Sequence, residues 1–127
     1  MAIKSAKDMV VEANAAVAKL TVDEAAGLVG KPGVVFVDVR EPAEWQAGHV
    51  PGAVHVPRGL LEFKADPALP AAHEKALDPG KKLVVYCASG GRSALAAKTL
   101  KDMGYPDVAN MMGGFGAWSQ AGKPSER

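Results

Sequence analysis

Four short apolar runs, rich in β-branched residues, constrain the fold of this chain most strongly. They are Val34–Val39, Gly52–Pro57, Lys82–Cys87 and Asp107–Met111. Near-continuous runs of this length are typical of strands that are buried on both faces of a sheet. Segments with helical patterns lie between them, and alternating strands and helices form a parallel sheet covered on both sides. The sequence therefore predicts an α/β fold with a mainly parallel sheet.

Capping signals and apolar periodicity indicate where the helices lie. Ser5–Asp8 and Thr21–Glu24 each place a hydroxyl residue three positions before an acid, which is the spacing of a capping box. A helix is expected after each, and Gly30–Gly33 is expected to end the second one. Further helices are expected at Glu41–His49, Arg58–Asp66, Pro70–Leu77, Gly91–Met103 and Gly113–Gly122, with Leu95, Ala96, Leu100 and Met103 facing the core.

Length, charge and cysteine content exclude several classes of protein. The 127 residues suit one domain, and a net charge of +1 gives no reason to expect a nucleic-acid partner. No apolar run approaches the ~20 residues of a membrane span. Asp8, Glu12 and Asn14 would interrupt the apolar core of a signal peptide. A single cysteine excludes an internal disulfide or a CxxC metal site, and favours a reducing, cytoplasmic setting.

The only cysteine, Cys87, stands at the end of a predicted strand. Ligands of parallel sheets bind beyond the carboxyl ends of the strands. The loop that follows, Ala88–Ser93, contains Gly90 and Gly91 and leads into a predicted helix. Such a loop lets backbone N–H groups converge, and the helix start adds a positive partial charge. Cysteines in settings of this kind have pKa values of about 3.5–7.5, so Cys87 is a candidate nucleophile.

Two other interpretations of Cys87 compete with this one. A lone cysteine at a strand end is often a small buried apolar residue. The loop could also bind an anion without covalent chemistry. The Gly-Gly-Arg-Ser sequence at Gly90–Ser93 and the strand–loop–helix setting favour the nucleophile, because an anion site alone needs no sulfur at its centre.

Three segments resemble the rhodanese domain family. Tyr86–Ser93 (YCASGGRS) is similar to its active-site loop, Asp38–Pro57 to its upstream signature, and Gly113–Trp118 (GGFGAW) to its downstream signature. The resemblance covers about residues 34–122. It implies a five-stranded parallel sheet flanked by helices, in a single domain of residues 1–127. Residues 19–122 would form the core, and residues 1–18 an additional N-terminal helix.

The resemblance implies sulfur transfer without a metal or an organic cofactor. A Cys87 thiolate would take the outer sulfur of thiosulfate and pass it to cyanide or a thiol, while the amides of Ala88, Ser89, Gly90, Gly91, Arg92 and Ser93 would stabilise the persulfide. Relatives of this fold that act as phosphatases or arsenate reductases carry one more residue between the cysteine and the arginine. The shorter loop here favours sulfur chemistry. A sulfur-carrier or regulatory module is the other alternative.

The roles of the charged residues near the site remain open at this point. Arg92 could recruit the anionic donor or pair with an acid that braces the loop. Arg58 could lie on the pocket rim or be a solvated charge. Asp38 and Arg40 are interpreted as supporting residues, because strand-end charges need partners when partly buried. The expected partners are a small anionic sulfur donor and a thiol or cyanide acceptor, with the choice between monomer and homodimer undecided.

Overall fold

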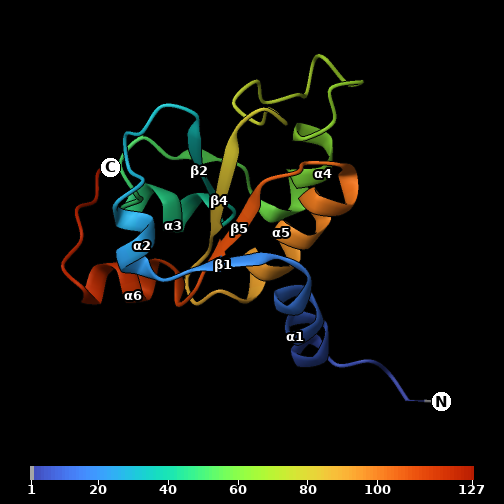
Figure 1. Cartoon of the computed structure of the whole chain (residues 1–127), viewed down its shortest axis with the longest axis horizontal. Coiled ribbons are helices and arrows are strands. Elements are labelled where there is room, and N and C mark those ends of the chain that lie inside the picture. Colours follow the sequence, from blue (N-terminus) through green and yellow to red (C-terminus); the bar gives the residue numbers. More distant parts are fainter. Residues whose placement is uncertain (1) are drawn as a thin grey trace.

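The computed structural model describes residues 2–127 and contains one parallel sheet. Its five strands run in the order β1-β5-β4-β2-β3 (Figure 1). The strands are β1 (Ala18–Leu20), β2 (Val34–Asp38), β3 (Val54–His55), β4 (Lys82–Tyr86) and β5 (Val108–Met111). All four strand pairs are parallel. The predicted α/β class and the five-stranded sheet are therefore confirmed.

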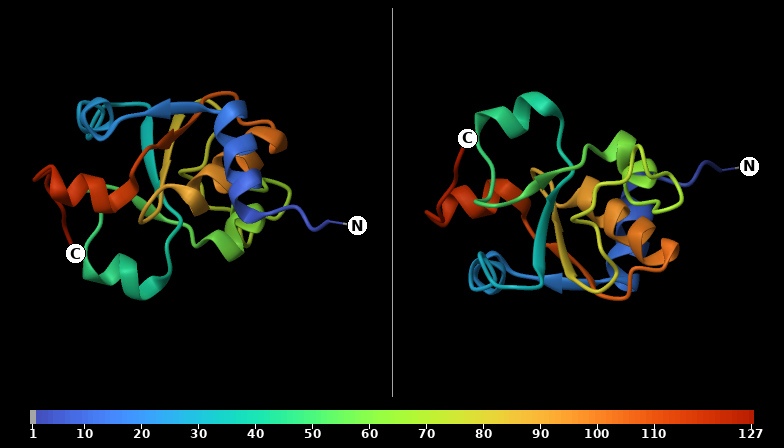
Figure 2. Two further views of the ribbon diagram at one scale, coloured as in Figure 1. Left: turned by 90° about the horizontal axis from the view of Figure 1, so that it is seen from below. Right: turned by 90° about the horizontal axis from the view of Figure 1, so that it is seen from above.

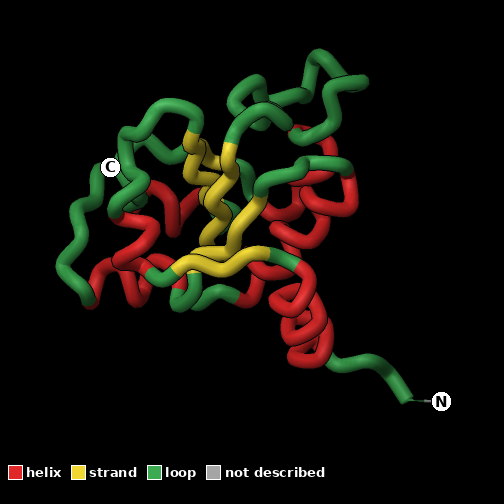
Figure 3. Tube along the Cα trace, in the orientation of Figure 1, coloured by secondary structure: helices red, strands yellow, loops and turns green. Residues whose placement is uncertain are grey.

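Helices cover both faces of the sheet. They are α1 (Ala6–Ala16), α2 (Val22–Ala26), α3 (Pro42–Ala47), α4 (Leu61–Lys64) with a preceding 3-10 turn η1 (Arg58–Leu60), α5 (Gly91–Met103) and α6 (Gly114–Gln120). Figures 2 and 3 show α1, α4 and α5 on one side of the strands, and α2, α3 and α6 on the other. Each face therefore has its own apolar layer.

The alternation of side chains along the central strands builds these two layers. Val37 and Val85, which are opposite each other in register, join the layer beneath α4 and α5. Their neighbours Phe36 and Val84 join the layer on the other face, with Trp118 of α6. Because both layers exclude water, the sequences of the central strands are continuously apolar and do not alternate between apolar and polar residues.

Two expectations about the elements need correction. The edge strand β1 was not predicted, because Ala18 and Lys19 are exposed and carry no strand pattern. Its pairing with β5 is what makes this segment a strand. Residues 70–77 form turns instead of a helix. The nearby prolines each remove a backbone donor. The Tyr105 hydroxyl holds this segment: it donates to the Ala65 carbonyl over 2.6 Å and lies 3.1 Å from the Leu77 carbonyl.

Other element boundaries shift by a few residues. The helix after Thr21 ends at Ala26, before the predicted stop at residues 30–33. The run at residues 52–57 supplies only the two residues of β3. On α5, Ala96 and Leu100 are buried as expected, whereas Met103 is 40% exposed.

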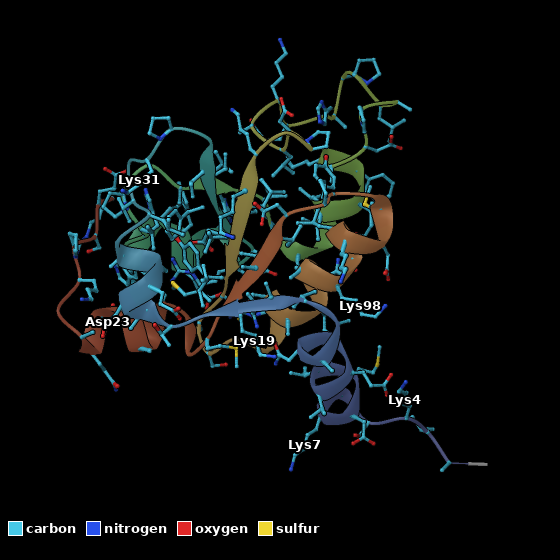
Figure 4. The ribbon with its side chains drawn as sticks, in the orientation of Figure 1. Lys4, Lys7, Lys19, Asp23, Lys31 and Lys98 are labelled. Atoms are coloured by element: carbon cyan, nitrogen blue, oxygen red, sulfur yellow. The ribbon has the colours of Figure 1, made fainter. Side chains whose placement is uncertain are left out.

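The N-terminal helix α1 packs against α5 through Ala13, which is buried. Lys101 of α5 also donates to the carbonyl of Ala16. Figure 4 shows Lys4 and Lys7 at the end of α1 farthest from the sheet. Among residues 2–127, no helix combines the length and the apolar character needed to cross a membrane.

Candidate functional site

Cys87 lies directly after β4, at the carboxyl end of the sheet and facing the start of α5. It is 1% exposed. The backbone N–H of Gly90 donates to its Sγ over 3.1 Å, and the Ser93 Oγ lies 3.4 Å from the same sulfur. Gly90 adopts φ = 108°, which favours glycine and turns the chain into α5. The loop thus folds around the sulfur atom.

The surroundings of Cys87 favour its thiolate. Burial alone would raise the pKa of the thiol. Hydrogen bonds from the Ser93 hydroxyl and from the backbone N–H groups of Ser93, Gly90 and Ser89 outweigh burial, so the pKa of Cys87 is lowered. A larger thiolate fraction at neutral pH makes Cys87 a nucleophile without a neighbouring base.

The start of α6 holds the other side of this loop. The N–H of Phe115 donates to the Cys87 carbonyl over 2.7 Å, and that of Gly116 to the Ala88 carbonyl over 2.9 Å. A Cβ at Gly114, where φ is 61°, would overlap both carbonyls. The glycines of the segment at residues 113–118 therefore allow two backbone segments to touch beside the cysteine.

Arg92 is paired with an acid that the sequence did not single out. Its Nη1 and Nη2 donate to Oε1 and Oε2 of Glu44, on α3, over 2.8 and 3.0 Å. These bonds lower the pKa of Glu44 to about 2 and raise that of Arg92. Cys87 makes a smaller contribution to the raised pKa of Arg92. The pair therefore stays ionised until the pH falls through about 2.

Asp38 and Arg40 form a second, buried ion pair at the end of β2. Arg40 Nη2 lies 2.7 Å from Asp38 Oδ2 and also donates to the Gly48 carbonyl over 2.7 Å. The Arg40 guanidinium stacks over the Phe115 ring, 4.4 Å from its centroid. The pair thereby ties β2 to the segment after α3 and to α6, the helix that holds the Cys87 loop.

Arg58 contacts residues of α4 and α5. It donates to Glu62 over 3.0 Å and to Thr99 Oγ1 over 3.3 Å. Thr99 lies about two turns along α5 from Arg92. Arg58 also lines a groove of about 320 Å³ between α1 and α5, together with Lys98 and Met9.

The histidines and tryptophans have structural contacts. His49 and His55 stack on Trp45, with ring centroids 3.5 and 4.9 Å away. Trp118 is fully buried and donates to the Pro124 carbonyl. Within residues 2–127, no group of three or more His, Cys, Asp or Glu side chains is arranged to hold a metal ion.

Solved structures share this architecture. A protein of unknown function and possible tyrosine phosphatase from Rhodopseudomonas palustris has a TM-score of 0.93 and 45% identity; the match covers 99% of this chain and 97% of that one. The polysulfide-sulfur transferase homodimer of Wolinella succinogenes has a TM-score of 0.73 and 35% identity, covering 94% and 85% of the two chains.

Several proteins similar in sequence to this chain are sulfurtransferases. The thiosulfate:glutathione sulfurtransferase of Saccharomyces cerevisiae is 35% identical over 106 residues, which cover 75% of this chain and 73% of that protein. A Bacillus subtilis relative named as a proposed sulfur carrier is 35% identical over 66% of this chain, and the match spans 40% of its own length. The model of the rhodanese-like domain matches residues 21–121. This chain therefore belongs to the rhodanese-like domain family.

Proposed function

We propose that this protein moves a sulfane sulfur from thiosulfate, or a similar donor, through a Cys87 persulfide to cyanide or a thiol. The observation that carries the proposal is a buried cysteine whose sulfur accepts a backbone N–H and whose pKa is lowered despite burial. Sulfurtransferase relatives at about 35% identity support the same reaction class.

The reaction proceeds in two displacements. The Cys87 thiolate attacks the outer sulfur of thiosulfate, a new S–S bond forms, and sulfite leaves with the electron pair of the old S–S bond. The persulfide then bears negative charge on its terminal sulfur, which the amides of residues 88–93 stabilise. Cyanide or a thiolate attacks that sulfur, and Cys87 leaves as the thiolate.

Two other functions have specific support. The Rhodopseudomonas palustris neighbour is described as a possible tyrosine phosphatase, so hydrolysis of a phosphate ester is the first rival. The Bacillus subtilis relative suggests the second, a sulfur carrier that loads Cys87 but needs a partner for turnover. Four residues lie between Cys87 and Arg92. This is one fewer than in phosphatases and arsenate reductases of related fold, and the shorter loop favours sulfur over phosphate chemistry.

Intact mass spectrometry after thiosulfate treatment tests the proposal. The protein is expected to gain the mass of one sulfur atom, and cyanide is expected to remove it with formation of thiocyanate. Loading without turnover would identify a carrier. Faster hydrolysis of an aryl phosphate than transfer of sulfur would overturn the proposal.

Arg92 is expected to recruit the donor. Arg92→Ala should raise KM for thiosulfate and lower kcat/KM about tenfold or more, since ~1.5 kcal/mol is lost with a charge-assisted contact. Added salt should weaken the wild-type reaction with the dianion and hardly affect the variant. Steady-state kinetics at two ionic strengths measures both effects.

Glu44 provides the matched variant for this test. Glu44→Gln keeps the shape of the side chain but removes the charge that neutralises Arg92. If Arg92 recruits the donor, kcat/KM for thiosulfate should rise while that for an uncharged persulfide donor stays constant. Equal losses for both donors in both variants would instead assign the ion pair to bracing of the loop.

A further inference from the structure

Asn110, in β5, contacts Ser93 and Gly90, which both hydrogen-bond to the sulfur of Cys87. It is fully buried. Its Oδ1 lies 2.6 Å from Ser93 Oγ, and its Nδ2 lies 3.3 Å from the Gly90 carbonyl. The same Nδ2 donates over 2.9 Å to Oδ1 of Asn14, on α1. A chain of polar contacts thus runs from α1 through Asn110 and Ser93 to Cys87.

The neighbours of Asn110 fix the orientation of its amide. The Gly90 carbonyl can only accept a hydrogen bond, so the NH₂ group of Asn110 faces Gly90, and its Oδ1 faces Ser93. Because Oδ1 is only an acceptor, the contact with Ser93 is a hydrogen bond only while the Ser93 hydroxyl donates to it rather than to the sulfur. Asn14 supports this orientation by accepting from the same NH₂ group.

Ser93 has one hydroxyl proton and two neighbours that can accept it. Ser93 Oγ lies 3.4 Å from the sulfur and 2.6 Å from Asn110 Oδ1. When Cys87 is a thiol, its S–H can donate to Ser93 Oγ, so the Ser93 proton can stay on Asn110. When Cys87 loses its proton to solvent, the thiolate can only accept. The Ser93 hydroxyl can donate to the thiolate only by turning away from Asn110, which leaves a buried amide oxygen without its donor.

We propose that Asn110, held by Asn14 of α1, competes with the Cys87 sulfur for the single hydroxyl proton of Ser93. Asn110 and Asn14 are then positioning residues that control formation of the nucleophile. Helix α1 lies outside the matched residues 21–121, so a segment beyond the family core becomes part of the site. The inference rests on the proposed role of Cys87 as the nucleophile.

The charged groups around Cys87 do not belong to the series of polar contacts that joins Asn14, Asn110 and Ser93. Arg92 of α5 is paired with Glu44 of α3. Asp38 and Arg40 form their own buried pair at the end of β2. Substitution of Asn14 leaves all four in place, so a change in the ionisation of Cys87 reports on the polar chain.

Titration of Cys87 in an Asn14→Ala variant tests the inference. Because Cys87 is the only cysteine, carbon-13 labelling of cysteine gives one Cβ resonance whose chemical shift follows ionisation. Loss of Asn14 makes reorientation of Asn110 easier. The acid dissociation constant of Cys87 is therefore expected to rise several-fold, up to about fivefold for one competing hydrogen bond. Asn110→Leu removes the competing acceptor and should produce at least as large a rise.

Two further variants separate this effect from general loosening of α1. In a Ser93→Ala background the competition is absent, so Asn14→Ala should no longer change the titration. Lys101→Ala removes a different contact between α5 and α1 and should leave the titration of Cys87 unchanged.

Three results would overturn the inference: an unchanged titration in Asn14→Ala, a lower acid dissociation constant in that variant, or the same shift with and without Ser93. The measurement needs no sulfur donor. Its failure is therefore distinct from failure of the proposed sulfurtransferase activity, which loading with thiosulfate reports.

Discussion

Cys87→Ser is expected to form no thiocyanate from thiosulfate and cyanide above the uncatalysed rate. A serine hydroxyl remains protonated at neutral pH and cannot hold a sulfane sulfur, whereas the nucleophile here must be a thiolate. The fold should survive, because a serine oxygen at this position can accept the Gly90 N–H that the sulfur accepts. Thiocyanate release and thermal unfolding, measured on the same preparation, check both statements.

Alkylation of the wild-type protein provides an independent control for this variant. Because Cys87 is the only cysteine, a thiol reagent modifies one site and leaves the rest of the chain unchanged. The modified protein should lose activity and should no longer gain sulfur mass. Thiocyanate formation that survives in Cys87→Ser would assign the transfer to another group.

The cysteine loop was predictable because its determinants are local. The strand, the glycines and the start of α5 all lie within residues 82–93, and each residue type there has a clear backbone preference. The same reasoning failed for β1, because a strand of only three residues is too short to show a pattern and forms where β5 offers an open edge. It also failed at residues 70–77, where helical composition is overridden by prolines and by the Tyr105 anchor.

The partners of the loop could not be found in the same way. Glu44 is 48 residues from Arg92, and Asn14 is 96 residues from Asn110. A single polar residue carries no signal of its distant partner, so only the fold identifies these contacts. The downstream glycines at residues 113–116 were matched by resemblance alone. Their physical reason, the close approach to the Cys87 carbonyl, appears once α6 is placed beside the loop.

Asp38→Ala is expected to destabilise the protein by about 3–5 kcal/mol. The substitution leaves the Arg40 guanidinium in place without its carboxylate, and removal of one partner from a buried ion pair typically costs that much. Asp38 is fully buried and Arg40 is 5% exposed, so water cannot replace the lost carboxylate. Denaturant unfolding should show a lower midpoint, with the free energy of unfolding obtained by linear extrapolation.

The exposed pair between Lys82 and Asp107 offers the matched control. Asp107 is 55% exposed in this pair, so Asp107→Ala removes the same kind of carboxylate at a cost below about 1 kcal/mol. In the double variant Asp38→Ala/Arg40→Met the uncompensated charge is gone, so much of the stability lost in Asp38→Ala should return. If Asp38→Ala costs no more than Asp107→Ala, the buried pair does not brace the end of β2. If the double variant is no more stable than Asp38→Ala, the loss comes from the carboxylate's other contacts, such as its bond to the Arg40 N–H.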